Sequence, residues 1–437
     1  MRSILSISSV SIITIILIVT VVSSNLNWEK EDWKGIIESD GKGYYAYLPA
    51  IFIYQDLNFG FFESIEEDKY YDENLYYDYR SHANGQVIDK YYCGTALLES
   101  PFFLIAHLFS YLLDYELDGY SILYPISINI SAIFYLLIGL IFLNATLDTY
   151  QIKSWQKAIT LFAAVFGTNL FYYTVGEPGM SHVFSFALIS LFYYYSRKYF
   201  LLNKKNHLLK LFFLLGLIVL TRPINGLIVF IIPFASGNYI TLKQGIIFGF
   251  RNKLCLLLGI SIFLCIVSIQ LIIYKLSTGS FFIYAYVDEG FNFLSPHITA
   301  ILFSYKKGLF LYTPIFLVAF VGCYFFWKTS RFEFFSWIGF FFLITFVLSS
   351  WWMWYYGGSF SSRVYVEYIP IFMIPLAISL NQIKRRPFKQ VFLSLIVILI
   401  IACQIQTYQY RYYQIHWSEM NKEIYWANFM RIDRLIK

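Results

Sequence analysis

The sequence predicts an all-α polytopic membrane protein with about eleven transmembrane helices, and with juxtamembrane helices in a long first external loop. Hydrophobic residues make up 58% of the 437 positions and charged residues only 14%, and the mean hydropathy is +0.57. A water-soluble domain with a solvated surface does not sustain that balance. Apolar runs close to the roughly 20 residues that cross a bilayer recur along the chain. Its 39 Tyr residues gather near the expected interfaces, where a ring with one polar edge is favoured.

The expected elements follow the apolar runs in chain order. Residues 4–22 are interpreted as an uncleaved first span rather than a signal peptide, because the run is about 19 residues long. A long external loop, residues 25–120, comes next. Further spans are expected at residues 121–147, 158–174, 182–196, 211–221, 224–235, 254–274, 308–327, 334–350, 369–383 and 390–405. Residues 1–405 then form one transmembrane domain, and residues 406–437 form a short external tail.

Residues 94–113 decide the sidedness of everything that follows them. The segment is long enough to cross, yet it contains Glu99, Pro101 and His107. A charge at bilayer depth costs a few kcal/mol. We therefore interpret the segment as a juxtamembrane or re-entrant helix, whereas a full crossing would exchange the two sides for every later loop.

The charge distribution agrees with that interpretation. It places just over half of the 33 Lys and Arg on one side with only two of the 27 acids, Asp148 and Glu333. The positive-inside rule identifies this side as cytoplasmic. The net charge of +6 then reflects membrane topology, and no nucleic-acid partner is expected. Four of the five cysteines lie in apolar runs, so neither a disulfide framework nor a cysteine metal site is predicted.

The first external loop supplies the leading catalytic candidate, Asp40, with Glu38 and Tyr44 close by. A carboxylate at the low-dielectric edge of the membrane can act as a general base or bind a divalent cation. The alternative is an aspartate that caps a helix or a turn, which the neighbouring glycines favour.

Later in the same loop, Lys90 stands where the chain returns towards the membrane, preceded by Arg80 and His82. A lysine in that place can hold a lipid phosphate as a point charge. The alternative is a side chain that extends to the interface only to keep its charge in water.

Further polar islands interrupt the apolar sequence on the same side. Ionisable groups near the membrane are expensive, so each is treated as a functional candidate. Arg222 lies between two short apolar runs and needs an anionic partner, whereas Arg363 and Glu367, four residues apart, could simply pair with each other. The candidates from these islands are Glu177, His182, Arg222, Asn225, Arg363 and Glu367.

The loop at residues 275–307 adds Lys306 as a pocket candidate, and its Asp288 and Glu289 are interpreted as an exposed turn. The sequence lacks the H-E-x-x-H, Walker, dinucleotide-binding and G-x-S-x-G motifs. It therefore offers no signature of a soluble nucleotide cofactor or of a serine nucleophile.

Taken together, these motifs resemble the GT-C membrane glycosyltransferases. The features are an Asp in the first external loop, Lys90-Tyr-x-x-Gly before a Pro-Phe segment, Arg222-Pro-x-Asn between short helices, and a Trp-rich Gly-Gly-x-Phe-x-x-Arg363 loop before a late span. More narrowly, the chain resembles bacterial relatives of protein O-mannosyltransferases and of the lipid A aminoarabinose transferase. The resemblance runs over most of the chain.

The resemblance implies an enzyme that moves a sugar from a polyprenyl-phosphate donor to a glycan, lipid or protein acceptor, with inversion at the anomeric carbon. Asp40 would be the base, or would organise the acceptor with a divalent cation, which is the one cofactor left open. Lys90 and Arg222, with Arg363 as a weaker candidate, would hold the donor phosphate. The chain has Ser39-Asp40 where the mannosyltransferase pattern has an Asp-Glu pair, and it lacks a large carboxy-terminal soluble domain.

The expected location is the bacterial cytoplasmic membrane, in contact with membrane lipids and with the active site facing outward. Two other functions remain open. A transporter or flippase of lipid-linked saccharides typically binds near the midplane between repeated halves, and no repeat is evident here. A surface-polysaccharide polymerase or ligase typically has a large external loop late in the chain, whereas the largest loop here follows the first span.

Overall fold

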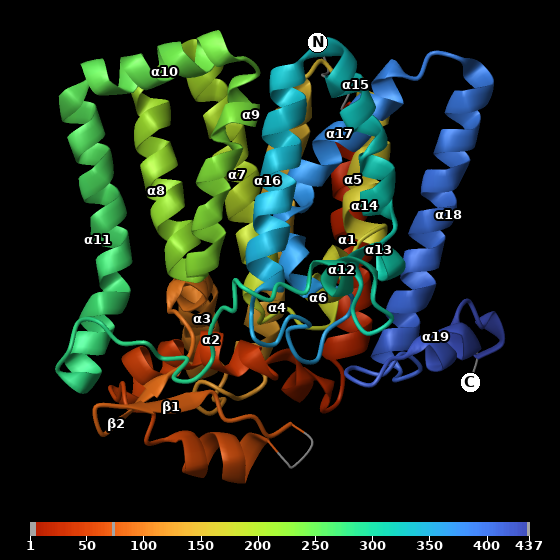
Figure 1. Ribbon diagram of the computed structural model, residues 1–437. Coiled ribbons are helices and arrows are strands. Elements are labelled where there is room, and N and C mark those ends of the chain that lie inside the picture. Colours follow the sequence, from red (N-terminus) through yellow and green to blue (C-terminus); the bar gives the residue numbers. More distant parts are fainter. Residues whose placement is uncertain (1–5, 72–74, 435–437) are drawn as a thin grey trace.

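The computed structural model describes residues 6–71 and 75–434, and it shows a bundle of upright helices with short helices and a hairpin below one end (Figure 1). Seven helical segments in this part of the chain are long and apolar enough to cross a bilayer, so the chain is an integral membrane protein. They are α1 (Ile7–Asn27), α3 (Gly94–Leu112), α4 (Leu123–Thr149), α11 (Lys253–Thr278), α16 (Arg331–Ser349), η5 with α17 (Arg363–Gln382) and α18 (Arg386–Arg411). The expected count of eleven spans stays a prediction, since the remaining helices are shorter, broken or, like the 22-residue α7, not apolar enough over their length.

The remaining helices fill the bundle and its ends. In the bundle are α5 (Ser154–Phe166), α6 (Leu170–Val175), α7 (Ser181–Leu202), α8 (Lys205–Thr221), η4 (Pro223–Ile231), α9 (Ile232–Ser236), α13 (Leu309–Tyr312), α14 (Ile315–Ala319) and α15 (Val321–Thr329). At the ends are η1 (Asp32–Ile36), α2 (Asp40–Pro49), η2 (Ala50–Tyr54), η3 (Phe62–Tyr70), α10 (Tyr239–Arg251), α12 (Ile298–Phe303), α19 (Lys422–Asn428) and η6 (Ile432–Arg434). The first loop also holds an antiparallel hairpin of β1 (Arg80–Ala83) and β2 (Gln86–Asp89), which pairs Arg80 with Asp89.

The break between α8 and η4 falls where the sequence predicts it. Arg222 is extended, with φ −150° and ψ 111°, and Pro223 begins the next helical segment. A proline disfavours helical geometry in the residue before it, which explains why α8 stops at Thr221. α8 begins at Lys205, six residues before the expected start, because its first turn is polar and carries no hydropathy signal.

The orientation of α3 bears on the sidedness of the protein. α3 is apolar and long enough to cross, but Figure 1 shows it almost end-on beneath α7 and α8, whereas the spans stand upright. Its side chains meet the first half of α4, as the contacts of Phe102 with Phe134 and of Phe103 with Tyr124 show. This arrangement favours the juxtamembrane interpretation of residues 94–113.

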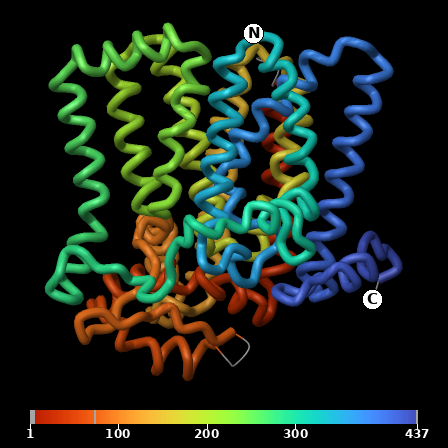
Figure 2. Tube along the Cα trace, viewed as in Figure 1, coloured from red at the N-terminus to blue at the C-terminus, as the bar shows by residue number. Residues whose placement is uncertain are grey.

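The two ends of the bundle differ in charge. Figure 2 shows the first described residues, α10 and the connector before α18 at one end, and the first loop and α19 at the other. The basic connectors of the sequence belong to the first group, and nearly all the acids belong to the second. This charge difference is the basis for the sidedness proposed below, because cytoplasmic loops of membrane proteins carry an excess of Lys and Arg. α18 continues to Arg411, beyond the expected boundary at residue 405.

Gly94 lets the first turn of α3 touch the end of α8. A Cβ at this position would overlap the backbone of Leu220 and Thr221, which cannot swing aside as a side chain can. We expect Gly94→Ala to lower the free energy of unfolding by about 1–3 kcal/mol, the usual cost of overpacking. Thermal unfolding in detergent measures this. Gly290→Ala is the control, because a Cβ there meets nothing within 4 Å, and equal melting temperatures for the two variants would contradict the prediction.

Candidate active site

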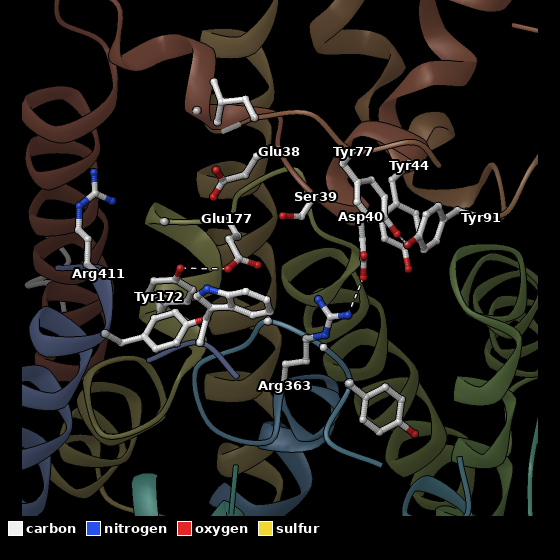
Figure 3. Close-up of a pocket in the computed structure, with 18 of the residues that line it drawn as sticks. Glu38, Ser39, Asp40, Tyr44, Tyr77, Tyr91, Tyr172, Glu177, Arg363 and Arg411 are labelled. Carbon is white, nitrogen blue, oxygen red and sulfur yellow. Dashed lines mark hydrogen bonds and ion pairs between the residues drawn. The ribbon is translucent and has the colours of Figure 1, made fainter. Parts of the chain in front are cut away.

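A cavity of about 1260 Å³ opens at the end of the bundle opposite the basic connectors, and Figure 3 shows part of its wall. Its lining comes from the first external loop, the connector between α6 and α7, the end of α8, the loop before α12, the segment before η5, and the end of α18. Seven residues predicted from the sequence line it together: Glu38, Asp40, Tyr44, Lys90, Glu177, Arg222 and Arg363.

Asp40 and Arg363 form an ion pair at the centre of this wall. Nη2 of Arg363 donates to Oδ2 of Asp40 at 2.6 Å. The side chain of Arg363 is 11% exposed and that of Asp40 is 19% exposed. Asp40 is the first residue of α2, and the helix dipole favours a negative charge there. The capping position belongs to Ser39, whose φ of 50° is unusual for a non-glycine residue. The expected alternative of a capping aspartate therefore does not describe Asp40.

The surroundings of Asp40 keep it ionised. Burial alone would raise the pKa of this carboxyl, but the charge of Arg363, a hydrogen bond from Tyr91 and the charge of Lys90 outweigh burial. The pKa consequently lies below its usual value of 3.8. At neutral pH Asp40 is thus a carboxylate that can accept a hydrogen bond from a ligand hydroxyl.

Two more cations lie on one side of that pair, and both have carboxylate partners from distant segments. Lys90 pairs with Glu289, and its Nζ lies 5.4 Å from the centre of the Tyr286 ring. Glu289 thus faces the cavity instead of forming the expected exposed turn.

Arg222 donates to Glu367, which is fully buried, and lies 3.4 Å from Nδ1 of His182. Nδ1 of His182 is itself 3.1 Å from Oε1 of Glu367. The expected pairing of Arg363 with Glu367 does not occur, because each of them finds an opposite charge on another element.

The other side of the cavity carries two carboxyl groups that face each other in Figure 3, Glu38 and Glu177. Tyr172 donates to Oε1 of Glu177 at 3.0 Å, and Oε2 has no hydrogen-bond partner among the described residues. Burial, followed by repulsion from Glu177, raises the pKa of Glu38 to about 8. Burial also raises the pKa of Glu177 to about 7, with Arg363 opposing the shift. Near neutral pH, Glu38 and Glu177 are therefore partly protonated, and together they carry less negative charge than two ionised carboxylates would.

Glu177 gives the fold a defined pH dependence. Its pKa rises from the ordinary 4.5 to about 7 in the folded chain, so the folded state holds its proton more tightly. The stabilising contribution is complete below about pH 4.5 and is lost as the pH rises towards 7. It amounts to about 3 kcal/mol at most.

We expect Glu177→Gln to lose less thermal stability than the wild type between pH 5 and pH 8, because glutamine cannot ionise. Melting temperatures at the two pH values measure this. Glu31→Gln, which changes an exposed acid at the cavity rim, should keep the wild-type dependence. The same pH dependence in all three proteins would rule out Glu177 as its source.

Several predicted site residues lie outside the cavity lining. Arg80 pairs with Glu63 and Asp78 and covers the Phe62 ring, so acids of its own loop already neutralise it. The remaining residues are His82 in the hairpin, His182 and Glu367 beneath Arg222, Asn225 bonded to Ser185 and Tyr368, and Lys306 over the Tyr355 ring.

Sequence reasoning missed other residues of the lining. Arg411 is the most important, because the expected last span stops six residues before it. Its signal was present: α18 ends in the tyrosine-rich run Tyr408 to Tyr412, which is typical of a helix that reaches an interface. Aromatic residues from five segments were missed as well, namely Tyr77, Tyr91, Tyr172, Tyr286, Trp352, Tyr356 and Tyr410.

The residues around Asp40 do not fit a divalent cation. The described part of the chain contains no group of three or more His, Cys, Asp or Glu side chains placed to hold a metal. The guanidinium of Arg363 already occupies one oxygen of Asp40, and a cation would have to displace it.

No family model matches the chain, and no curated protein sequence matches it. Among solved structures, ArnT from Cupriavidus metallidurans bound to undecaprenyl phosphate is similar, with a TM-score of 0.52 and 12% identity. The match covers 92% of this chain and 64% of that one. The archaeal oligosaccharyltransferase AglB from Archaeoglobus fulgidus, in complex with an inhibitory peptide and a dolichol-phosphate, gives a TM-score of 0.47 at 12% identity, over 95% of this chain and 57% of that one.

This chain therefore spans less than two thirds of the length of either structure. At 12% identity the likeness to ArnT concerns the fold alone. That fold is the one found in GT-C membrane transferases, and it confirms the fold that the motif resemblance predicts.

Proposed function

We propose that this protein is a glycosyltransferase that takes a sugar from a polyprenyl-phosphate donor and passes it to an acceptor on the non-cytoplasmic face. One observation carries the proposal: an ionised carboxylate, Asp40, lies in the wall of a large cavity beside Arg363, and Lys90 and Arg222 line the same cavity. A carboxylate and several fixed cations are the groups that sugar transfer from a phosphate requires.

The chemistry follows from the charges. An acceptor hydroxyl oxygen attacks the anomeric carbon, the bond from that carbon to the phosphate oxygen breaks, and the phosphate leaves with an added negative charge. Asp40 accepts the hydrogen bond of the attacking hydroxyl and takes up its proton as the new bond forms. Lys90 and Arg222 stabilise the leaving phosphate in a site with little water. Attack opposite the leaving group inverts the anomeric centre.

The cations keep donors for this role although each is paired. A guanidinium has five N–H donors, and the contacts of Arg222 with Glu367 and His182 both use Nη1. The remaining donors can reach a phosphate without breaking the buried pair. The ArnT structure of the same fold holds undecaprenyl phosphate, which supports a lipid phosphate as the ligand here.

The proposed location is the bacterial cytoplasmic membrane, with the cavity facing outward. The cavity is lined by the first loop, the loop before α12 and the end of α18, and Figure 1 shows these elements at the end of the bundle opposite α10. A site at one end of the bundle also favours a transferase over a flippase, which is expected to bind near the midplane.

The test is incubation of the purified full chain with a panel of polyprenyl-phosphate sugars, with the lipid products read by mass spectrometry. We expect the chain to release polyprenyl phosphate from at least one member, and Arg80→Gln to retain this activity because Arg80 lies outside the cavity. Transport of an intact lipid-linked sugar across vesicles, without cleavage, would replace the transferase with a flippase.

A further inference from the structure

Arg411 differs from the other cations that line the cavity. Lys90, Arg222 and Arg363 each have a carboxylate partner, whereas no ion pair of Arg411 occurs within residues 6–71 and 75–434. Its contacts are two long hydrogen bonds of 3.4 Å, from Nη2 to the carbonyl of Leu26 and to Oδ1 of Asn27. Both acceptors are uncharged, so the positive charge of Arg411 is not neutralised by a partner.

The nearby acids do not supply the missing charge. The charge of Arg411 lowers the pKa of Glu38, but burial and the charge of Glu177 outweigh it and raise that pKa to about 8. Glu38 is therefore largely protonated at neutral pH. Glu177, which faces Glu38, also has a raised pKa, of about 7. A half-buried guanidinium without a compensating charge favours an anionic ligand.

A narrow groove of about 220 Å³ continues from the cavity at Arg411. It shares five lining residues with the cavity: Leu26, Tyr172, Gly176, Arg411 and Tyr412. Beyond them it runs between α1, α6 and α18. Gln404 and Arg411 both line it and are seven residues apart, so it follows α18 for about 10 Å.

The groove suits a hydrocarbon chain. Val22, Leu26, Phe171 and Val175 contribute apolar side chains to its wall. The side-chain amide of Gln404, which also lines it, is already bonded to the carbonyl of Phe166. α18 stands at the edge of the bundle in Figure 1, and its outer residues Ile398 and Ile401 are exposed, as expected of a helix that faces lipid. An apolar groove beside lipid that ends at an unpaired arginine matches a lipid with an anionic head.

We propose that this groove binds the acceptor of the reaction, and that the acceptor is a phosphate-headed membrane lipid. Its chain lies between α1, α6 and α18, and its phosphate contacts Arg411. This inference rests on the proposed function and deepens it by naming the class of acceptor.

The position of the groove distinguishes acceptor from donor. α8, which ends beside Arg222, and α18, which ends at Arg411, stand on opposite sides of the bundle in Figure 1. The donor phosphate is assigned to the side of Lys90 and Arg222. A lipid at Arg411 therefore approaches Asp40 from the other side, as a nucleophile must when it attacks opposite the leaving group.

The test uses the purified full chain in phosphatidylcholine nanodiscs, with phosphatidic acid carrying a photoreactive diazirine near the middle of one acyl chain. Crosslinked peptides are identified by mass spectrometry. We expect crosslinks to concentrate on α1, α6 and α18 around Val22, Phe171 and Thr407. Arg411→Gln should lower their yield roughly tenfold, because a charge-assisted hydrogen bond is lost.

Three further arms make the result decisive. Thr407→Trp should block the groove and lower the crosslink yield while Arg411 stays in place, and Lys90→Gln should leave the yield unchanged. Excess unlabelled phosphatidic acid should displace the probe. Failure of unlabelled phosphatidic acid to displace the probe, an equal loss in Lys90→Gln, or an unchanged yield in Arg411→Gln would overturn the inference.

The readout needs no turnover, so it separates two failures. A chain that cleaves no lipid-linked sugar but gives the expected crosslinks would refute the proposed function and leave an anionic-lipid groove. A chain that transfers sugar but shows no groove crosslinks would refute the acceptor assignment alone. Size-exclusion profiles of all variants confirm that they remain folded.

Discussion

Replacing Asp40 with asparagine is expected to reduce sugar transfer by about 10²–10⁴-fold, the usual contribution of a positioned acid or base. The amide keeps an oxygen that can accept from Nη2 of Arg363, so the local geometry can persist. What it loses is the negative charge and the ability to take a proton. The measurement is the initial rate of product formation at saturating donor and acceptor, with the melting temperature as a check on folding.

Asp32→Asn is the matched control for Asp40→Asn. Asp32 is an exposed acid that lines the same cavity, and no ion pair of its own appears among the described contacts. Its variant is expected to transfer sugar at the wild-type rate. If Asp40→Asn also keeps near-normal turnover, Asp40 has no role in the chemical step.

Replacing Arg222 with alanine is expected to have two separate effects. The first is on stability: Glu367 is fully buried, and removing its guanidinium partner leaves a charge with only His182 nearby. Breaking a buried pair in this way costs about 3–5 kcal/mol. The second is on donor use, which should weaken about 10–100-fold through the loss of charged hydrogen bonds.

A double variant separates these effects. Glu367→Gln removes the orphaned charge, so Arg222→Ala with Glu367→Gln should recover most of the lost melting temperature. Donor KM should remain raised, because no guanidinium is present to hold the phosphate. A double variant with a normal donor KM would show that Arg222 is purely structural.

Much of the site was predictable because its members are costly residues in an apolar sequence. Asp40, Lys90, Arg222 and Arg363 were each selected as ionisable groups at expected membrane interfaces, and all four line one cavity. Arg411 was missed because the hydropathy signal of α18 fades before the helix ends. Arg80 lies outside the lining, because two acids of its own loop, Glu63 and Asp78, bind it.

The partners of the charges were not predictable. Arg363 and Glu367 are four residues apart, a spacing that pairs side chains on an α-helix. They lie instead in η5, a 3-10 helix, where about three residues per turn put positions four apart on different faces. Each was therefore free to meet a partner from elsewhere, Asp40 for Arg363 and Arg222 for Glu367.

The sequence by itself determined that this chain is a helical membrane protein with its acids and basic connectors at opposite ends, because hydropathy and charge add up locally along the chain. Only the tertiary structure decided which charges meet. Asp40 and Arg363 are 323 positions apart, and no local pattern encodes that contact. It depends on how α2, the connector before α7 and η5 come together, which is a property of the whole bundle. The same packing creates the unpaired Arg411 and the groove beside it.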